Sequence, residues 1–192
     1  SYNLATVNLG LDVGLGPVAK TYVQLGLDEA PPKYASILLG TAQLNPVEVA
    51  QMYNTLANGG FRSPLRAVRA VIDEQGKALK APELEVTEAA PAEAVYTLNR
   101  MLIEVFERGT ARPAKKALPP GLVVAGKTGT SNDYRDSWFA GFSGGHVIVV
   151  WMGHDDNANT GLTGTTGALQ AWTRLMASIS TTSFDPLMPE AV

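Results

Sequence analysis

Three strand-like segments follow one another in the last third of this chain, and they constrain its fold more than any other feature. They cover residues 122–130, 137–143 and 146–152. Gly144-Gly145, a tight-turn dipeptide, separates the second segment from the third. Strands joined by such short connections pair as antiparallel neighbours. The chain is therefore expected to fold around an antiparallel sheet.

Helical patterns lie on both sides of these segments. Asn45-Pro46-Val47-Glu48 predicts the start of a helix, with Asn as the cap and Pro at the first helical position, and Asn58-Gly59-Gly60 predicts its end. Two more helices are expected over 91–108 and 167–180. The expected buried stripes are Val49, Met52, Tyr53 and Leu56; Val95, Leu98, Leu102, Val105 and Phe106; and Ala168, Leu169, Trp172, Leu175, Met176 and Ile179.

The order of these elements gives the fold class. Helices first, an antiparallel sheet later and a packing helix last make an α+β fold, an antiparallel sheet packed by helices. Alternating apolar positions before Asp73-Glu74-Gln75-Gly76 add an exposed hairpin. Residues 1–180 are expected to form one unit. Residues 181–192, which contain Pro186 and Pro189 and show no periodicity, are expected to be a loosely held tail.

Composition excludes several classes of function. The net charge is -3 with no basic run, so no nucleic-acid partner is expected. The chain has no cysteine and only two histidines, which removes disulfides and cysteine-ligated metals, and no metal or cofactor is expected. Its longest apolar run, Val147 to Met152, is too short to cross a bilayer, so this segment is expected to make no membrane contact.

Residues 121–128 match the P-loop expression G-x-x-x-x-G-K-[ST], but the context is wrong for phosphate binding. A P-loop has a strand before its first glycine and a helix after its lysine. Here Pro119-Pro120 precede Gly121, the residues between the glycines themselves predict a strand, and turn formers follow Thr128. A strand that ends in Lys127 is the better interpretation.

Two further motifs also fail on context. Residues 141–145 match the nucleophile elbow G-x-S-x-G, but a strand rather than a helix follows Ser143. The acidic segment from His154 resembles the first half of a calcium loop, yet Thr160 stands where that loop requires glycine and Thr166 stands where it requires glutamate. A tight hairpin and a solvated loop are expected instead.

Lys127-Thr128-Gly129-Thr130 can bind a carboxylate. In a strand, the hydroxyls of Thr128 and Thr130 emerge on one face and Lys127 on the other. Gly129 has no side chain, so another backbone can approach closely. We therefore expect an extended peptide to add to this edge and to place its terminal carboxylate near the hydroxyls and the ammonium group.

Residues 127–142, with K-T-G-T-S-N-D followed by D-S-W-F-A-G-F, closely resemble the transpeptidase domain of class A penicillin-binding proteins. Residues 37–41, 44–50 and 56–60 are similar to the family's segment between its second and third motifs, and Ser1-Tyr2-Asn3 is similar to its S-x-N motif. The resemblance covers roughly residues 1–180 and implies a β-lactamase/transpeptidase-like fold, present only in part. The family's S-x-x-K motif, which carries the nucleophilic serine, is absent from this chain.

The resemblance also implies roles for individual residues in peptidoglycan cross-linking by a serine D,D-transpeptidase. Ser1 would relay a proton and Lys127 would keep the site positive. Asn3 would orient the donor amide, while Thr128 and Thr130 would hold the carboxylate of a D-Ala-D-Ala stem peptide. Gly129 would allow the backbone of this peptide to approach closely. The N–H of Thr130 would form half of an oxyanion hole.

A wider setting is implied in the same way. The nucleophile would come from an upstream segment, possibly a separate chain, and a neighbouring stem peptide would supply the acceptor amine. β-Lactams would acylate the same serine. A glycosyltransferase domain and a membrane anchor would lie upstream and place the enzyme on the periplasmic side of the bacterial inner membrane. Two alternatives stay open: a noncatalytic peptide-binding module on the same scaffold, and a D,D-carboxypeptidase or β-lactamase of the same superfamily.

Overall fold

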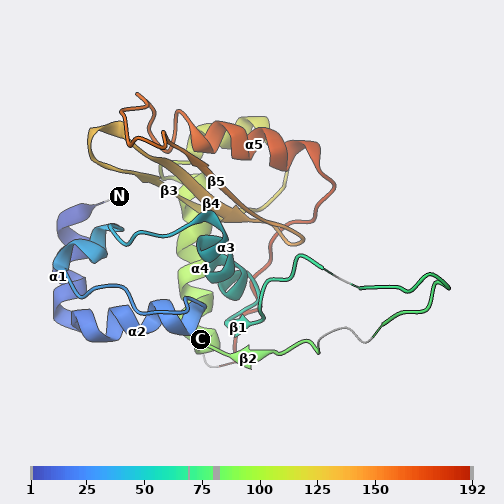
Figure 1. Ribbon diagram of the computed structural model, residues 1–192. Coiled ribbons are helices and arrows are strands. Elements are labelled where there is room, and N and C mark those ends of the chain that lie inside the picture. The colour runs from blue at the N-terminus through green and yellow to red at the C-terminus, as the bar shows by residue number, and fades with distance from the viewer. Residues whose placement is uncertain (1, 69, 80–82, 191–192) are drawn as a thin grey trace.

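The computed structural model describes residues 2–68, 70–79 and 83–190. Its helices and strands follow one another along the chain as shown in Figure 1. The helices are α1 (Asn3–Val13), α2 (Leu15–Leu25), η1 (Ala35–Leu39), α3 (Pro46–Ala57), α4 (Ala92–Glu107), η2 (Arg112–Ala117), η3 (Asn132–Tyr134) and α5 (Ala168–Ser178). The strands are β1 (Phe61–Arg62), β2 (Thr87–Glu88), β3 (Ala125–Thr130), β4 (Ser137–Phe142) and β5 (Val147–Met152).

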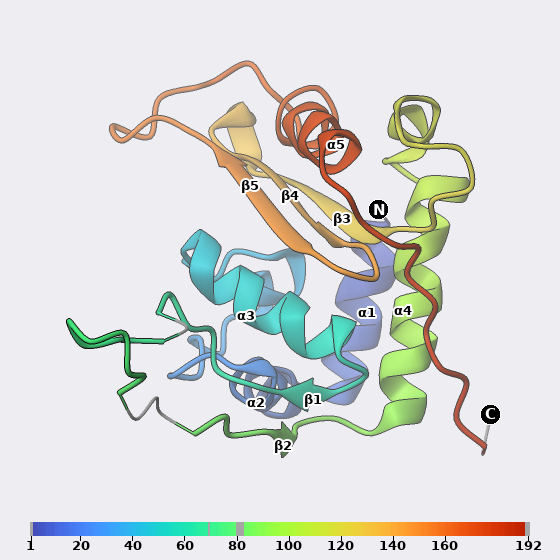
Figure 2. The same ribbon diagram turned by 90° about the vertical axis from the view of Figure 1, so that its right-hand side faces the viewer.

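The central sheet has the order β3-β4-β5, and both pairings are antiparallel. Helix α5 covers one face of this sheet and α3 lies on the other, while α4 runs past the β3 edge (Figure 2). The predicted α+β fold, with an antiparallel sheet packed by helices, is therefore confirmed. The tight turn at Gly144-Gly145 is also present, since the N–H of Ser143 donates to the carbonyl of His146 at 2.9 Å.

Each face of the sheet has its own apolar core, because side chains on a strand alternate between the faces. On the α5 face, Phe139 packs against Trp172 of α5 and Phe106 of α4, with ring centroids 4.9 and 5.8 Å away. On the α3 face, Phe142 packs against Tyr53 of α3 and against Phe184. Helix α4 contributes to both cores and thereby fixes the β3 edge between them.

The predicted helices match α3, α4 and α5 closely. In α3 the Asn45 side chain accepts from the N–H of Glu48, and the Glu48 side chain accepts from the N–H of Asn45, which makes a complete capping box. Two positions of the expected stripes were wrong. Leu98 and Leu175 are 38% and 46% exposed, whereas the polar residues Asn99 and Thr173 of the same two helices are buried.

Helices α1 and α2 were not predicted. In α1 the apolar residues do not gather on one face, so the sequence gives no helical periodicity there. Large apolar side chains of α1 remain exposed, namely Leu4, Leu9, Leu11 and Val13. Helix α1 packs closely against η1: a Cβ on Gly10 would lie 2.3 Å from a methyl carbon of Leu38, so the Leu38 side chain would have to shift to make room for a larger residue.

The expected exposed hairpin is present as an arm that leaves the body of the molecule (Figure 1). Its turn is closed by the N–H of Gly76 donating to the carbonyl of Asp73, and Ile72 forms a single bridge with Ala78. Two further backbone hydrogen bonds join the limbs of the arm, from the N–H of Leu79 to the carbonyl of Val71 and from the N–H of Asp73 to the carbonyl of Lys77, while the side chains of Val71, Ile72 and Leu79 stay exposed.

Residues 181–184, at the start of the expected tail, contact the body of the molecule. Phe184 is 7% exposed and its ring lies 4.7 Å from that of Phe142. Its N–H donates to the carbonyl of Val123, and the N–H of Gly144 donates to the carbonyl of Thr182. The expectation of a loose tail came from the lack of an apolar repeat in its sequence. Residues 181–184, here called the strap, are held by one aromatic side chain and by backbone hydrogen bonds, and such contacts require no repeating pattern. Within the described residues, no helix is long and apolar enough to span a membrane.

Candidate active site

Strand β3 carries the lysine and threonine motif in the predicted alternation. Lys127 pairs with Ala140 and Gly129 with Trp138, whereas Thr128 pairs with Phe139 of the α5-side core. The strand begins buried at Ala125 and ends exposed at Thr130. The motif thus lies within a strand and not in a loop before a helix, which excludes the P-loop interpretation.

Lys127 is only partly exposed, and this changes its acid–base behaviour. Its Nζ donates to the carbonyl of Thr128 at 3.0 Å. Burial lowers the pKa of Lys127 below its ordinary value, because removal from water penalises the charged ammonium form. A negatively charged ligand beside Nζ would stabilise the ammonium form.

The two threonine hydroxyls of β3 are held by different loops. Thr128 Oγ1 lies 2.7 Å from Thr110 Oγ1, just after α4. Thr130 Oγ1 accepts a hydrogen bond of 2.8 Å from the N–H of Gly164, in the turn before α5. Both hydroxyls therefore have fixed positions at the end of the edge strand.

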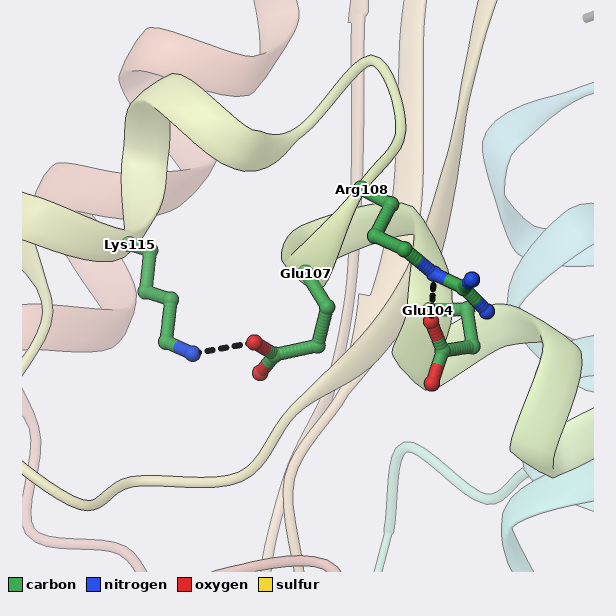
Figure 3. Close-up of polar contacts among 4 residues, drawn as sticks. All are labelled: Glu104, Glu107, Arg108 and Lys115. Atoms are coloured by element: carbon green, nitrogen blue, oxygen red, sulfur yellow. Dashed lines mark hydrogen bonds and ion pairs between the residues drawn. The ribbon is translucent and has the colours of Figure 1, made fainter.

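The end of α4 is braced where the chain turns toward Thr110. Arg108 Nε donates to Glu104 at 2.6 Å, and Lys115 of η2 pairs with Glu107 (Figure 3). These pairs are solvent-exposed, so each contributes little to stability. The Lys115–Glu107 pair joins η2 to the end of α4 across the segment that contains Thr110, whereas the Arg108–Glu104 pair lies within the last turn of α4.

A tryptophan pair lies on the Lys127 face of the sheet. Trp138 and Trp151 stand in register with Gly129 across the three strands, and their ring centroids are 6.2 Å apart. The indole N–H of Trp151 donates to Asp136 at 2.9 Å, which fixes that ring. A Cβ on Gly129 would lie 3.1 Å from Trp138 Cβ, so glycine keeps this face open.

The remaining predicted site residues lie at the N-terminus. Ser1 lies outside the described residues. Asn3 is the first residue of α1 and is exposed. The N-terminal end of α1 lies near the β3 edge in both views (Figures 1 and 2). The fold thus brings the start of the chain and the K-T-G-T strand to the same side of the molecule.

An apolar cavity of about 310 Å³ lies elsewhere, between α2 and α3. Its lining is formed by Val18, Thr21, Tyr22, Leu25, Met52, Tyr53 and Leu56. None of these side chains belongs to β3, and the lining contains no carboxylate or ammonium group. The chemistry therefore concentrates at the strand and not in the cavity.

A comparison with known protein families shows to which family the chain belongs. Residues 1–173 match the family model described as the penicillin binding protein transpeptidase domain. The chain belongs to this transpeptidase family. The resemblance to class A penicillin-binding proteins drawn from residues 127–142 is thereby confirmed.

Curated relatives agree with the family assignment. The chain is 42% identical to penicillin-binding protein 1B of Escherichia coli over 194 residues, which cover 100% of this chain and 23% of that protein. It is 40% identical to penicillin-binding protein 1B of Haemophilus influenzae, over 90% of this chain and 22% of that protein. The chain thus spans less than a quarter of the length of these two relatives.

Solved structures confirm the transpeptidase fold. Penicillin-binding protein 1A from Haemophilus influenzae superposes with a TM-score of 0.82 at 18% identity, over 96% of this chain and 34% of that chain. Penicillin-binding protein A from M. tuberculosis, solved as an imipenem acyl-enzyme complex, superposes with a TM-score of 0.71 at 20% identity, over 91% of this chain and 44% of that chain.

The sequence interpretation missed two segments that contact the candidate site. Thr110 and the turn Thr163–Thr166 both support β3 from loops distant in sequence. In the sequence, Thr166 stood out only as a mismatch to a calcium loop, and the described residues contain no acidic or histidine cluster that could hold a metal ion. No local signal marked Gly164, because it stands in a loop, where glycine is an ordinary turn residue.

Proposed function

We propose that this chain supplies the substrate-binding and catalytic support residues of a serine D,D-transpeptidase that cross-links peptidoglycan. One observation carries the proposal. The half-buried ammonium group of Lys127 lies next to an edge-strand end whose two threonine hydroxyls are held by neighbouring loops. This arrangement can bind the carboxylate of an extended peptide in a set position, which acyl transfer requires.

The reaction begins with a serine from an S-x-x-K segment outside these 192 residues. Its Oγ attacks the carbonyl carbon of the penultimate D-Ala in a donor stem peptide. The Oγ–C bond forms, the C–N bond to the terminal D-Ala breaks, and that amine leaves with a proton relayed through the Ser1 hydroxyl. An amine from a second stem peptide then attacks the ester, forms the cross-link and returns the proton to the serine.

The residues of this chain support both steps. Lys127 keeps the hydroxyl network polarised and the site positive, and Asn3 orients the donor amide. Thr128 and Thr130 hold the terminal carboxylate, while Gly129 lets the donor backbone approach. The N–H of Thr130 stabilises the developing oxyanion, a contribution of about 3 kcal/mol for a single donor.

The wider setting is part of the same proposal. The whole protein carries a glycosyltransferase domain and a membrane anchor upstream, and it acts on the periplasmic side of the bacterial inner membrane. β-Lactams acylate the same serine as the donor peptide. The support for this setting is the likeness to penicillin-binding proteins 1A and 1B.

A labelling experiment tests the proposal. The full-length protein that contains residues 1–192 should be labelled by a fluorescent penicillin, whereas residues 1–192 alone should stay unlabelled. Cross-linked dimers should accumulate when the full-length protein acts on lipid-linked precursor, and penicillin should abolish them. Labelling of the isolated chain would contradict the assignment of the nucleophile. A full-length protein that neither binds penicillin nor forms cross-links would support the noncatalytic module instead, and release of D-Ala without cross-links would support a carboxypeptidase.

A further inference from the structure

We propose that Gly164 is a positioning residue that presets the Thr130 hydroxyl as a hydrogen-bond donor to the carboxylate of the ligand. This inference rests on the proposed transpeptidase function and deepens it. A hydroxyl group has one proton to donate and two lone pairs that accept. What the hydroxyl does for a ligand therefore depends on which of these the protein already uses.

In the structure, the protein uses an acceptor side of Thr130. The N–H of Gly164 points at Thr130 Oγ1 over 2.8 Å, and a backbone N–H can only donate. Among residues 2–68, 70–79 and 83–190, no acceptor lies within hydrogen-bond reach of the Thr130 hydroxyl. Thr130 is exposed, so its hydroxyl proton is available to a ligand carboxylate.

Gly164 can approach Thr130 only because it has no side chain. A Cβ at this position would lie 2.6 Å from the carbonyl oxygen of Gly129 and 2.8 Å from that of Trp138. Both atoms belong to the paired backbones of β3 and β4, which cannot move aside without breaking the sheet. Any larger residue must therefore lift the turn away from the strand.

The turn that carries Gly164 is rigid and anchored. Thr163 and Thr166 exchange hydrogen bonds between their hydroxyls and backbone N–H groups at 2.9 to 3.1 Å. The carbonyl of Gly164 accepts from the N–H of Leu169, a fully buried residue of α5. The carbonyl of Thr163 accepts from the hydroxyl of Ser137 on β4. The N–H of Gly164 is thus fixed relative to both the helix and the sheet.

The test compares two ligands that differ only at the carboxylate. Acylation rate constants of the full-length protein are measured with benzylpenicillin and with its methyl ester, and their ratio gives the preference for a free carboxylate. Gly164→Ala should lower this ratio about tenfold, the size typical of a lost hydrogen bond to a charged group. Thr130→Val should lower it similarly, and adding Gly164→Ala to Thr130→Val should lower it little further. A merely structural role would slow both ligands alike.

Two variants complete the design. Gly16→Ala adds the same methyl group on α2, where a Cβ meets no atom within 4 Å, and should leave the ratio unchanged. Thr166→Val removes a hydroxyl from the turn without adding a clash, so it should also lower the ratio of acylation rate constants, by a smaller factor. This variant replaces Gly164→Ala as the test if Gly164→Ala does not fold. An unchanged ratio in folded Gly164→Ala would overturn the inference; if that variant does not fold, an unchanged ratio in Thr166→Val would do so. In either case, acylation of the wild-type protein would leave the proposed function intact. A wild-type protein that no penicillin acylates would overturn both.

Discussion

The hydroxyl of Thr110, just beyond α4, lies 2.7 Å from the hydroxyl of Thr128 on β3. The two residues are 18 positions apart, and their contact fixes the side of the strand that faces away from Lys127. The carbonyl of Thr110 also accepts from the hydroxyl of Thr165, in the turn that contains Gly164. The loop after α4 and the turn before α5 therefore brace the motif strand together.

Removal of the Thr110 hydroxyl should weaken this brace. Thr110→Val keeps the shape of the side chain but leaves Thr128 without its partner, which costs about 1 kcal/mol and should slow penicillin acylation about fivefold. Thr110→Ser retains the hydroxyl and should stay close to wild type. The second-order acylation rate constant of the full-length protein measures both effects, and equal rates for Val and Ser would contradict the role given to the hydroxyl.

The lowered pKa of Lys127 predicts a specific pH profile. The ammonium form is lost as pH rises through the folded-state pKa, which lies below the ordinary lysine value of about 10.4. Acylation should therefore decline at alkaline pH earlier than ordinary lysine titration allows. Lys127→Arg stays protonated over this range, so its normalised profile should extend to higher pH even if its rate is lower. Coinciding alkaline limbs for the two proteins would show that another group titrates.

A side chain at Gly129 should block ligand approach more than it harms the fold. Gly129→Val places branched carbons beside Trp138 and over the open face of β3, whereas valine itself favours strands. Acylation should fall by at least tenfold, with the melting temperature lowered by only a few degrees. The combination of penicillin labelling and thermal unfolding separates the two effects. Retained labelling in a folded variant would count against ligand binding along this strand.

The strap at residues 181–184 should contribute measurable stability. Phe184→Ala removes a ring that packs against Phe142 in the α3-side core, and it should lower the free energy of unfolding by about 3 kcal/mol. Leu187→Ala is the matched control, because Leu187 is 90% exposed and should change stability by less than about 0.5 kcal/mol. Urea unfolding monitored by circular dichroism measures both, and equal midpoints would show that the strap is not anchored.

Local patterns predicted the elements that carry strong periodic or capping signals. The helix start at Asn45-Pro46 and the alternation around Gly129 are properties of adjacent residues, so the sequence displays them directly. The strand position of Lys127 followed from its flanking residues in the same way. The predictions of these elements were correct because local preference and tertiary packing favour the same conformation.

The contacts that brace the site could not be predicted in this way. Thr110 and Gly164 reach β3 through chain reversals that no periodicity encodes, and their partners lie 18 and 34 positions away. Helix α1 was missed because its apolar side chains are not arranged on one face. Phe184 was missed because one anchoring ring in an irregular segment has no repeating pattern.

The register of Gly129, Trp138 and Trp151 places a tryptophan beside the motif strand, so intrinsic fluorescence can report on ligand binding there. The chain contains three tryptophans, and the third, Trp172, is completely buried on the opposite face of the sheet. A peptide or β-lactam lying along Gly129 would displace water from the indole of Trp138 and change its emission. Binding at β3 can therefore be followed without a label, and Trp138→Phe identifies which indole reports it.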